Sequence, residues 1–236
     1  MPEAYALGPI WYVVFLLSLT CHEAAHALAA KWGGDLTAFH AGQVTLDPIP
    51  HMRREPFGTI LFPILSFLLS SGGWMIGWAS APYDPAWQQR YPRRAALMAL
   101  AGPIANFILV LIAALAIWVG IWNGTFLAPQ SINFTQVVAP SQTAGLPNAL
   151  ATFFSILFSL NLLLGTFNLL PFPPLDGNTV VGLFLSESAA LKFYEFSHNQ
   201  AFSLIGLFAA WKIFDYVFRP VFVFALNVLY PGATYH

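Results

Sequence analysis

The stretch LGPIWYVVFLLSLTCHEAAHALAAKWGGD, residues 7–35, combines a long apolar run with a cluster of ionisable residues. It begins as an apolar run, and crossing the hydrocarbon of a bilayer takes about 20 such residues. Near its end it carries His22, Glu23 and His26, and Lys31 follows. An ionisable group inside a membrane helix costs roughly 2.5 to 3.5 kcal/mol, so this cluster needs a reason.

The composition is that of a membrane protein. Of the 236 residues, 58% are hydrophobic and only 8% are charged, whereas about 25% of a soluble domain is charged. No polar stretch is long enough for a separate soluble domain. We therefore expect an all-α polytopic membrane protein with one membrane-embedded domain over residues 1–236. Its core covers about 7–180, and helical segments follow over about 181–236.

Charge and cysteine usage limit the partners. The net charge of −1 leaves no basic face for nucleic acid, so we expect the lipid bilayer and no nucleic acid as a partner. The single cysteine, Cys21, cannot form an internal disulfide. The N-terminus lacks the basic region of a signal peptide, so the first apolar run is expected to remain in the mature protein.

Five apolar segments are candidates for membrane spans, over residues 7–30, 57–78, 95–122, 149–170 and 200–229. The last contains Lys212, Asp215, Arg219 and Pro220, so we expect a helix to about residue 218 followed by a short second helix. Lys212 and Asp215 favour an ion pair on one helix face over a proton path.

Basic residues in short loops indicate the orientation, because they gather on the cytoplasmic side. They occur in loops 31–56 and 79–94, and loop 123–148 has no charge. If 57–78 were an ordinary span, the two basic loops would lie on opposite sides. A membrane-embedded hairpin, favoured by Pro63 and by the Ser70–Gly73 break, removes the conflict; a kinked single span is the alternative. With the hairpin, segments 7–30 and 149–170 run in parallel toward the cytoplasm.

Residues 36–49 alternate in a β-like manner before Pro48 and Pro50. This pattern indicates a small β-hairpin at the membrane surface, and its strands near 36–47 are candidates to pair with an extended peptide.

The motif His-Glu-x-x-His places two imidazoles one turn apart on the same face of a helix. Both can then bind one zinc ion, which leaves Glu23 free to act as a base. Two other interpretations stay open. The side chains of His22 and His26 could simply be hydrogen-bonded or exposed at an interfacial helix end, or they could bind haem, although haem ligands usually come from facing helices.

A catalytic zinc needs a third protein ligand, and Asp176 is the best candidate. It lies in NLLPFPPLDGNTV, residues 168–180, where Pro171, Pro173 and Pro174 cannot continue a regular helix. The freed backbone groups must line protein or water, which suits a buried hydrolytic site. A plain Asp-Gly turn is the alternative. The parallel direction of the two segments would bring Asp176 to the depth of the histidines.

These motifs together resemble the site-2 proteases, the zinc intramembrane metalloproteases of family M50. HEAAH matches the family's H-E-x-x-H, NLLPFPPLDGN matches N-x-x-P-x-x-x-L-D-G, and ALAGPIANF (99–107) matches the G-P-x-x-N segment of its middle helix. The resemblance implies a site-2 protease-like helix bundle in which one zinc ion is bound by His22, His26 and Asp176, with Glu23 as catalytic base. It also suggests Asn168, Pro171 and Gly177 as groups that hold the substrate or the oxyanion.

The chain is most similar to the compact subgroup without PDZ and CBS domains. That subgroup has a P-H-x-D-P-x-G-like run, from which the sequence after His51 departs. His51 is therefore an accessory candidate, with a place in a surface loop as the alternative. For Asn106 we expect a role in helix packing rather than in catalysis.

The resulting hypothesis is a zinc endopeptidase of a prokaryotic cell membrane that cleaves transmembrane segments of other proteins near the cytoplasmic side. A membrane ion or metal transporter using His22, His26 and Asp176 is the main alternative, although no internal repeat supports it. A catalytically inactive scaffold is a third. The sequence does not identify the natural substrate or show whether that substrate must first be cleaved elsewhere. It does not identify the oligomeric state or the gating motion either.

Overall fold

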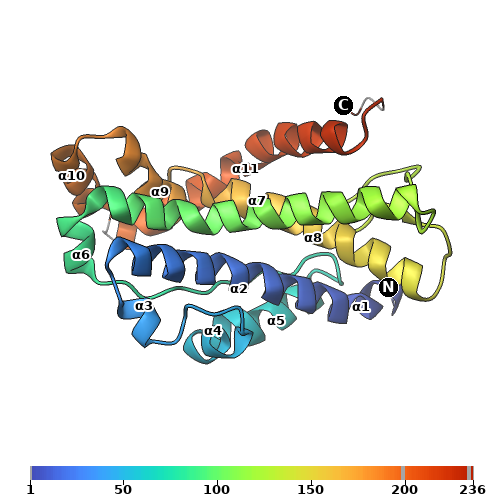
Figure 1. The fold of residues 1–236 in the computed structure, drawn as a ribbon, viewed down its shortest axis with the longest axis horizontal. Coiled ribbons are helices and arrows are strands. Elements are labelled where there is room, and N and C mark those ends of the chain that lie inside the picture. Colours follow the sequence, from blue (N-terminus) through green and yellow to red (C-terminus); the bar gives the residue numbers. More distant parts are fainter. Residues whose placement is uncertain (1, 198–199, 233–234, 236) are drawn as a thin grey trace. The chain divides into compact units, whose positions relative to one another are not determined.

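The computed structural model of the chain describes residues 2–197, 200–232 and 235 and is mostly helical (Figure 1). Its longer elements are α2 (Gly8–Gly33), α7 (Pro92–Trp122), α8 (Leu146–Asn168), α10 (Glu187–Ser197) and α11 (Gln200–Leu229). Its shorter helices are α1 (Pro2–Ala6), α3 (Thr37–His40), α4 (Pro48–Arg54), η1 (Phe57–Leu61), α5 (Phe62–Leu69), α6 (Pro85–Arg90), α9 (Asp176–Val180) and η2 (Val181–Phe184).

Four helices in the described part of the chain are long and apolar enough to cross a membrane. They are α2, α7, α8 and, over Ala201–Leu229, α11. Each matches one of the apolar segments in the sequence, so the predicted polytopic helical fold is confirmed.

The chain divides into two compact units. The first contains Met1–Thr20, Asp47–Ser80 and Phe107–Leu162; the second contains Cys21–Leu46, Ala81–Asn106 and Leu163–His236. The divisions fall inside α2, α7 and α8, so each of these helices contributes to both units.

In the first unit, α2 and α8 pack through apolar side chains and one buried polar contact. Trp11, Phe15 and Ile156 are fully or almost fully buried. Three residues after Phe15 and five after Ile156, Asn161 Nδ2 donates to Ser18 Oγ at 2.8 Å, and both residues have no exposed surface. Because hydrocarbon offers no competing hydrogen-bond partner, this contact fixes the register of the two helices.

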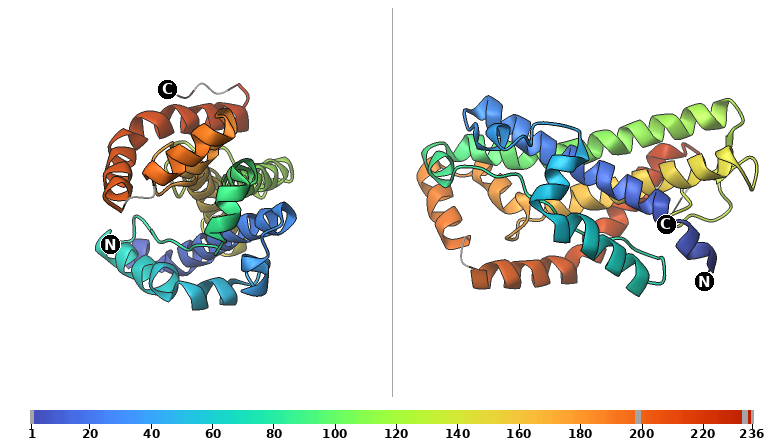
Figure 2. Two further views of the ribbon diagram at one scale, coloured as in Figure 1. Left: turned by 90° about the vertical axis from the view of Figure 1, so that its left-hand side faces the viewer. Right: turned by 90° about the horizontal axis from the view of Figure 1, so that it is seen from below.

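The segment 57–78 folds back on itself. Its helical part, Phe57–Leu69, is too short to span a bilayer. A turn follows, in which Ser71 and Gly72 have φ angles of 56° and 83°, and the chain then returns in extended form (Figure 2). Trp78 N donates to Gly58 O at 3.0 Å, so the two ends of the segment lie together. The hairpin interpretation is therefore confirmed in shape, and the kinked single span is wrong.

Serine side chains hold the returning segment against the helix. Ser70 Oγ accepts a hydrogen bond from Trp74 N, and Ser66 Oγ accepts one from Ile76 N, both at 2.9 Å. Gly58 is required here because a Cβ at this position would collide with the Trp78 carbonyl.

The β-hairpin predicted near 36–47 is wrong. That stretch forms α3 and turns, and Asp47 then caps α4 by accepting a hydrogen bond from Ile49 N at 2.9 Å. An N-cap followed by Pro48 at the first helical position is a strong helix start, and it outweighs the weak β-like alternation. Among the described residues, a two-stranded antiparallel sheet occurs instead in the first unit, where β1 (Phe126–Leu127) pairs with β2 (Ala139–Pro140).

The predicted break in the last helix is also wrong, because α11 continues through Pro220. A proline inside a helix removes one backbone hydrogen bond, whereas ending the helix within lipid leaves several backbone polar groups unsatisfied. The expected ion pair of Lys212 with Asp215 is not formed within the described chain. Lys212 Nζ lies instead 5.4 Å from the centroid of the Phe208 ring.

In the second unit, α11 packs against the proline-rich segment after α8. Leu170, Leu175 and Ala210 form a buried cluster there. Gly206 of α11 leaves no room for a Cβ beside the Pro173 carbonyl. The segment that carries Asp176 is thus fixed by the helix beside it.

The Ser18–Asn161 contact can be tested by a double-mutant cycle. For Ser18→Ala and Asn161→Ala we expect a coupling energy of about 0.6 to 1.7 kcal/mol, the range for hydrogen bonds between membrane helices. Unfolding in mixed micelles with increasing denaturing detergent measures it. The exposed Asn123→Ala variant serves as control and should not couple to Ser18→Ala; a Ser18–Asn161 coupling equally close to zero would contradict the assignment.

Candidate metal centre

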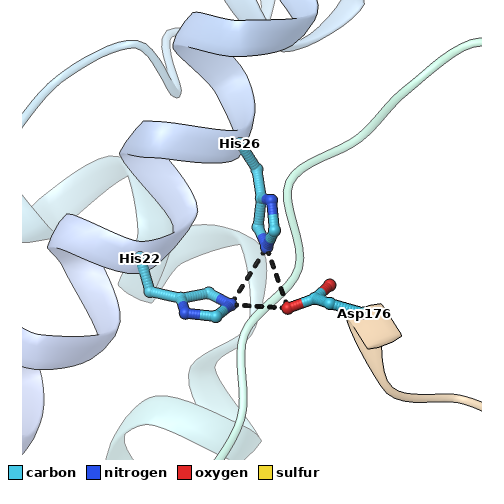
Figure 3. Close-up of side chains that lie close together, drawn as sticks. All are labelled: His22, His26 and Asp176. Carbon is cyan, nitrogen blue, oxygen red and sulfur yellow. Dashed lines mark hydrogen bonds and ion pairs between the residues drawn. The ribbon is translucent and has the colours of Figure 1, made fainter. Parts of the chain in front are cut away.

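Three side chains meet at one point in the second unit. His22 and His26 come from successive turns of α2, and Asp176 is the first residue of α9 (Figure 3). Asp176 Oδ2 lies 3.1 Å from His22 Nε2 and 3.3 Å from His26 Nε2, and the two nitrogens are 2.9 Å apart. The juxtaposition expected from the sequence is therefore present.

Local structure brings Asp176 to this point. α8 ends at Asn168, and short turns follow, with hydrogen bonds from Phe172 N to Leu170 O and from Leu175 N to Phe172 O. Leu175 is extended, and α9 begins directly after it. Gly177 lies so close to the carbonyls of Leu169 and Leu170 that no side chain fits. The Leu-Asp-Gly sequence thus aims the carboxylate and lets its helix pack closely.

Both imidazoles are oriented by α7 from the side away from Asp176. His22 Nδ1 lies 2.6 Å from Asn106 Oδ1, and His26 Nδ1 lies 2.7 Å from the Met98 carbonyl. Both partner atoms are oxygens that accept hydrogen bonds, so each Nδ1 carries the proton and donates it. Each Nε2 then presents a lone pair toward Asp176, as in metal sites whose histidines are held by an outer hydrogen bond.

Gly102 gives the two rings their space. A Cβ at this position of α7 would collide with the Nε2 atoms of both His22 and His26. Gly102 stands one turn before Asn106 on the same helix face, so a single face of α7 both accommodates and orients the imidazoles. Pro103 between them lacks a backbone N–H, so it cannot donate to the Ala99 carbonyl one turn earlier.

The donor set fits a metal ion. Two imidazole lone pairs and a carboxylate oxygen repel one another unless a cation lies between them. A tetrahedral ion with bonds of about 2.0 to 2.2 Å separates its ligands by roughly 3.3 to 3.6 Å, which is close to the spacing of the three atoms. Two nitrogens and one oxygen, with a fourth position left open, are the ligand set of a catalytic zinc.

The helix that begins with Asp176 is fixed at its far end by α10. Tyr194 Oη donates to Thr179 O at 2.8 Å, and Asn178 Nδ2 donates to Ser197 Oγ at 2.9 Å. Burial raises the pKa of Tyr194 to about 12, so the hydroxyl keeps the proton that it donates. Tyr194 and Ser197 thereby position Asp176 without contacting it.

The remaining candidate residues lie as follows. Glu23 is buried beside His22 in α2; Asn168 is the last residue of α8, half-buried; Pro171 is exposed in the turn after it. His51 is 2% exposed in α4, so its placement in a surface loop is wrong.

Sequence reasoning missed the roles of the α7 residues. Asn106 was expected to serve helix packing, yet it contacts His22 directly. The signal was present in the Gly-Pro-x-x-Asn motif, whose four-residue spacing places its glycine and asparagine on one helix face. The Met98 carbonyl and Tyr194 carried no such signal, because a backbone group and a lone tyrosine form no motif.

Removing the outer hydrogen bond should weaken metal binding. For Asn106→Ala we expect zinc affinity to fall by about 10- to 100-fold, the usual cost of losing such a partner. Competition with a chromogenic chelator measures the affinity. The matched control is Asn123→Ala, just beyond the other end of the same helix and exposed, which should bind zinc like the wild type. Equal affinities in the two variants would contradict the role of Asn106.

Filling the space at Gly102 should be more damaging. In Gly102→Ala the methyl group would take the room of the two Nε2 atoms, so zinc affinity should fall further than in Asn106→Ala. Alanine is the better helix former, so helical content should not decrease. Zinc analysis and circular dichroism of the same sample separate the two effects; full zinc occupancy would show that the rings do not need this space.

Comparison with known proteins agrees with this site. The sequence profile described as Peptidase family M50 matches residues 10–211. The chain is also 35% identical over 177 residues to a protein of Bacillus subtilis (strain 168) named "Putative zinc metalloprotease YwhC", covering 75% of this chain and 69% of that protein. No solved structure matches the chain. On the family match and this relative, the protein belongs to peptidase family M50, the zinc metalloproteases.

Proposed function

We propose that the protein is a zinc-dependent endopeptidase that hydrolyses peptide bonds within transmembrane segments of other membrane proteins. The observation that carries the proposal is the convergence of His22, His26 and Asp176 in a chain with four candidate spans. His22 and His26 belong to the span α2 itself. A catalytic centre built on such a helix favours substrates that are themselves in the membrane.

The three side chains would hold one zinc ion per chain. When bound, zinc supplies a Lewis acid that polarises the scissile carbonyl and makes a water molecule more acidic. The hydrogen bonds that the two Nδ1 atoms donate to the oxygens of Asn106 and Met98 keep both histidines in the tautomer that this requires.

Glu23 would be the general base. It follows His22 directly, so it lies about 100° around α2, beside the ligands and not among them. Its carboxylate would take a proton from the attacking water and pass it to the leaving amine. Its burial keeps bulk water from competing for that proton.

The segment between α8 and α9 is our candidate for substrate binding. A helical substrate hides its carbonyls in its own hydrogen bonds, so it must unwind locally before cleavage. Asn168, at the end of α8, would hold the substrate or the oxyanion through its amide. Pro171 and Gly177 flank a stretch without regular helix, whose backbone groups can pair with the unwound chain.

We place the protein in a bacterial cell membrane with its centre toward the cytoplasm. The relative from Bacillus subtilis supports the bacterial setting. The basic residues of loops 31–56 and 79–94 support the orientation, because the fold-back of 57–78 allows both loops to lie on one side. His51, buried in α4, stays a candidate accessory residue.

The proposal is tested by separating metal binding from cleavage. For Glu23→Gln we expect zinc content to equal that of the wild type, while cleavage of a model transmembrane substrate in proteoliposomes falls by about 10²- to 10⁴-fold. The amide keeps the size of the side chain but cannot accept the proton. Metal analysis and a gel-based cleavage assay on the same preparation measure both quantities.

Asp176→Ala provides the complementary variant and should lose both zinc and cleavage. Substantial cleavage by Glu23→Gln would exclude Glu23 as the base, and full zinc occupancy without Asp176 would exclude the third ligand. Metal flux into sealed proteoliposomes without any cleavage would instead favour a transporter.

A further inference from the structure

The loop after α2 and the short helix α6 enclose an open hollow of about 560 Å³ in the second unit. Its walls come from residues 34–40 and 84–91. α6 lies at the end of α2 (Figure 1), where Trp87 Nε1 donates to the carbonyl of Gly33, the last residue of α2, at 3.1 Å. The hollow shares no residue with the metal centre and has no part in the proposed mechanism.

Two guanidinium groups stand at the edge of the hollow. The Cζ atoms of Arg90 and Arg94 lie 5.4 and 4.4 Å from the centroid of the Tyr91 ring, so one aromatic side chain orders both groups. Arg94 Nη1 also donates to Gly33 O at 3.0 Å. Among the residues that the structure describes, neither arginine forms an ion pair. Each guanidinium has five N–H donors, so donors remain for an anion.

The two carboxylates in the hollow are engaged by the chain itself. Asp35 is buried, and it accepts hydrogen bonds from Thr37 N and Oγ1 and, at 2.9 Å, from Asp84 N. Asp84 in turn accepts one from Ala86 N at 2.8 Å. Over residues 31–40 and 84–94, four basic residues outnumber these two acids. The surface around the hollow therefore keeps a net positive charge.

The position of the hollow along α2 places it at the membrane surface. It begins directly after α2, whose last turn carries Lys31 and Trp32, and Trp32 is 78% exposed. Tryptophan and basic residues at the end of a span are typical of the headgroup region. Leu36 and Phe39 are exposed beside it. A soluble anion would leave this apolar surface uncovered, whereas a phospholipid brings acyl chains together with its phosphate.

We propose that the hollow binds the headgroup of an anionic phospholipid. Arg90 and Arg94 hold the phosphate, and the acyl chains lie over Leu36 and Phe39. The planar fork of a guanidinium matches the geometry of two phosphate oxygens, which makes arginine well suited to this contact. Basic residues next to the end of a span attract anionic headgroups for the same reason.

Lipid titration of the full-length protein in detergent tests the proposal, with native mass spectrometry to count the bound lipids. Dioleoylphosphatidylglycerol should bind at one site roughly ten times more tightly than dioleoylphosphatidylcholine, which has the same acyl chains but no net charge. Arg90→Gln should weaken phosphatidylglycerol binding by about fivefold, and Arg90→Gln with Arg94→Gln by about 25-fold, from the contribution of each basic side chain near an anionic lipid.

The matched control is Arg53→Gln, the same exchange at an exposed arginine of α4 in the first unit, which should bind the lipid like the wild type. Zinc content equal to that of the wild type shows that each variant is folded. If the double variant does not fold, Arg90→Gln alone decides, because it leaves the hydrogen bond of Arg94 to Gly33 in place. Equal affinity for the two lipids would overturn the proposal, as would an Arg90→Gln protein that binds like the wild type or an equal loss in Arg53→Gln.

Competition identifies the bound species. Inorganic phosphate or a glutamate-rich peptide, each at the concentration of the lipid, should not displace phosphatidylglycerol, because neither covers the apolar surface beside the hollow. Displacement by phosphate would assign the hollow to a soluble anion, and displacement by the peptide would assign it to an acidic protein segment. Either result would overturn the lipid as its occupant.

Discussion

The structure of the centre depends on the hydrogen bonds that α7 makes to the far side of two imidazoles. Without the Asn106 amide and the Met98 carbonyl, His22 and His26 could each rotate or carry the proton on the other nitrogen. With these hydrogen bonds in place, both Nε2 lone pairs and the Asp176 carboxylate converge on one position. The sequence of α7 then follows from this constraint, because Gly102 must be small and Asn106 must stand one turn later.

A second set of contacts fixes the third ligand from outside. α9 has only five residues, which is too short to be stable alone. It is held by close packing of Gly177 on the preceding carbonyls and by Tyr194 and Ser197 of α10. The centre is therefore precise because rigid neighbours surround it, although the ligand itself begins a very short helix next to an irregular segment.

Much of this could be predicted from the sequence, since apolar runs and fixed spacings are local signals. Apolar runs and motif spacings predicted the spans, the histidine pair and the distant Asp176. The distribution of basic residues in the loops predicted the fold-back at 57–78. The β-hairpin predicted at 36–47 was wrong because the alternation of residue types there is weak. The helix start formed by Asp47 and Pro48 involves only a few residues, yet it outweighs that alternation. The continuity of α11 through Pro220 and the burial of His51 depend on the lipid environment and on tertiary packing, which leave no periodic trace.

The separation of the ligands along the chain also affects biosynthesis. Asp176 is made about 150 residues after His26, when the segments over α2, α7 and α8 have already left the ribosome or are leaving it. A nascent chain that ends before this point has two imidazoles but no carboxylate, so it cannot complete the donor set. The order of synthesis thus delays completion of the donor set until most of the membrane segments have been made.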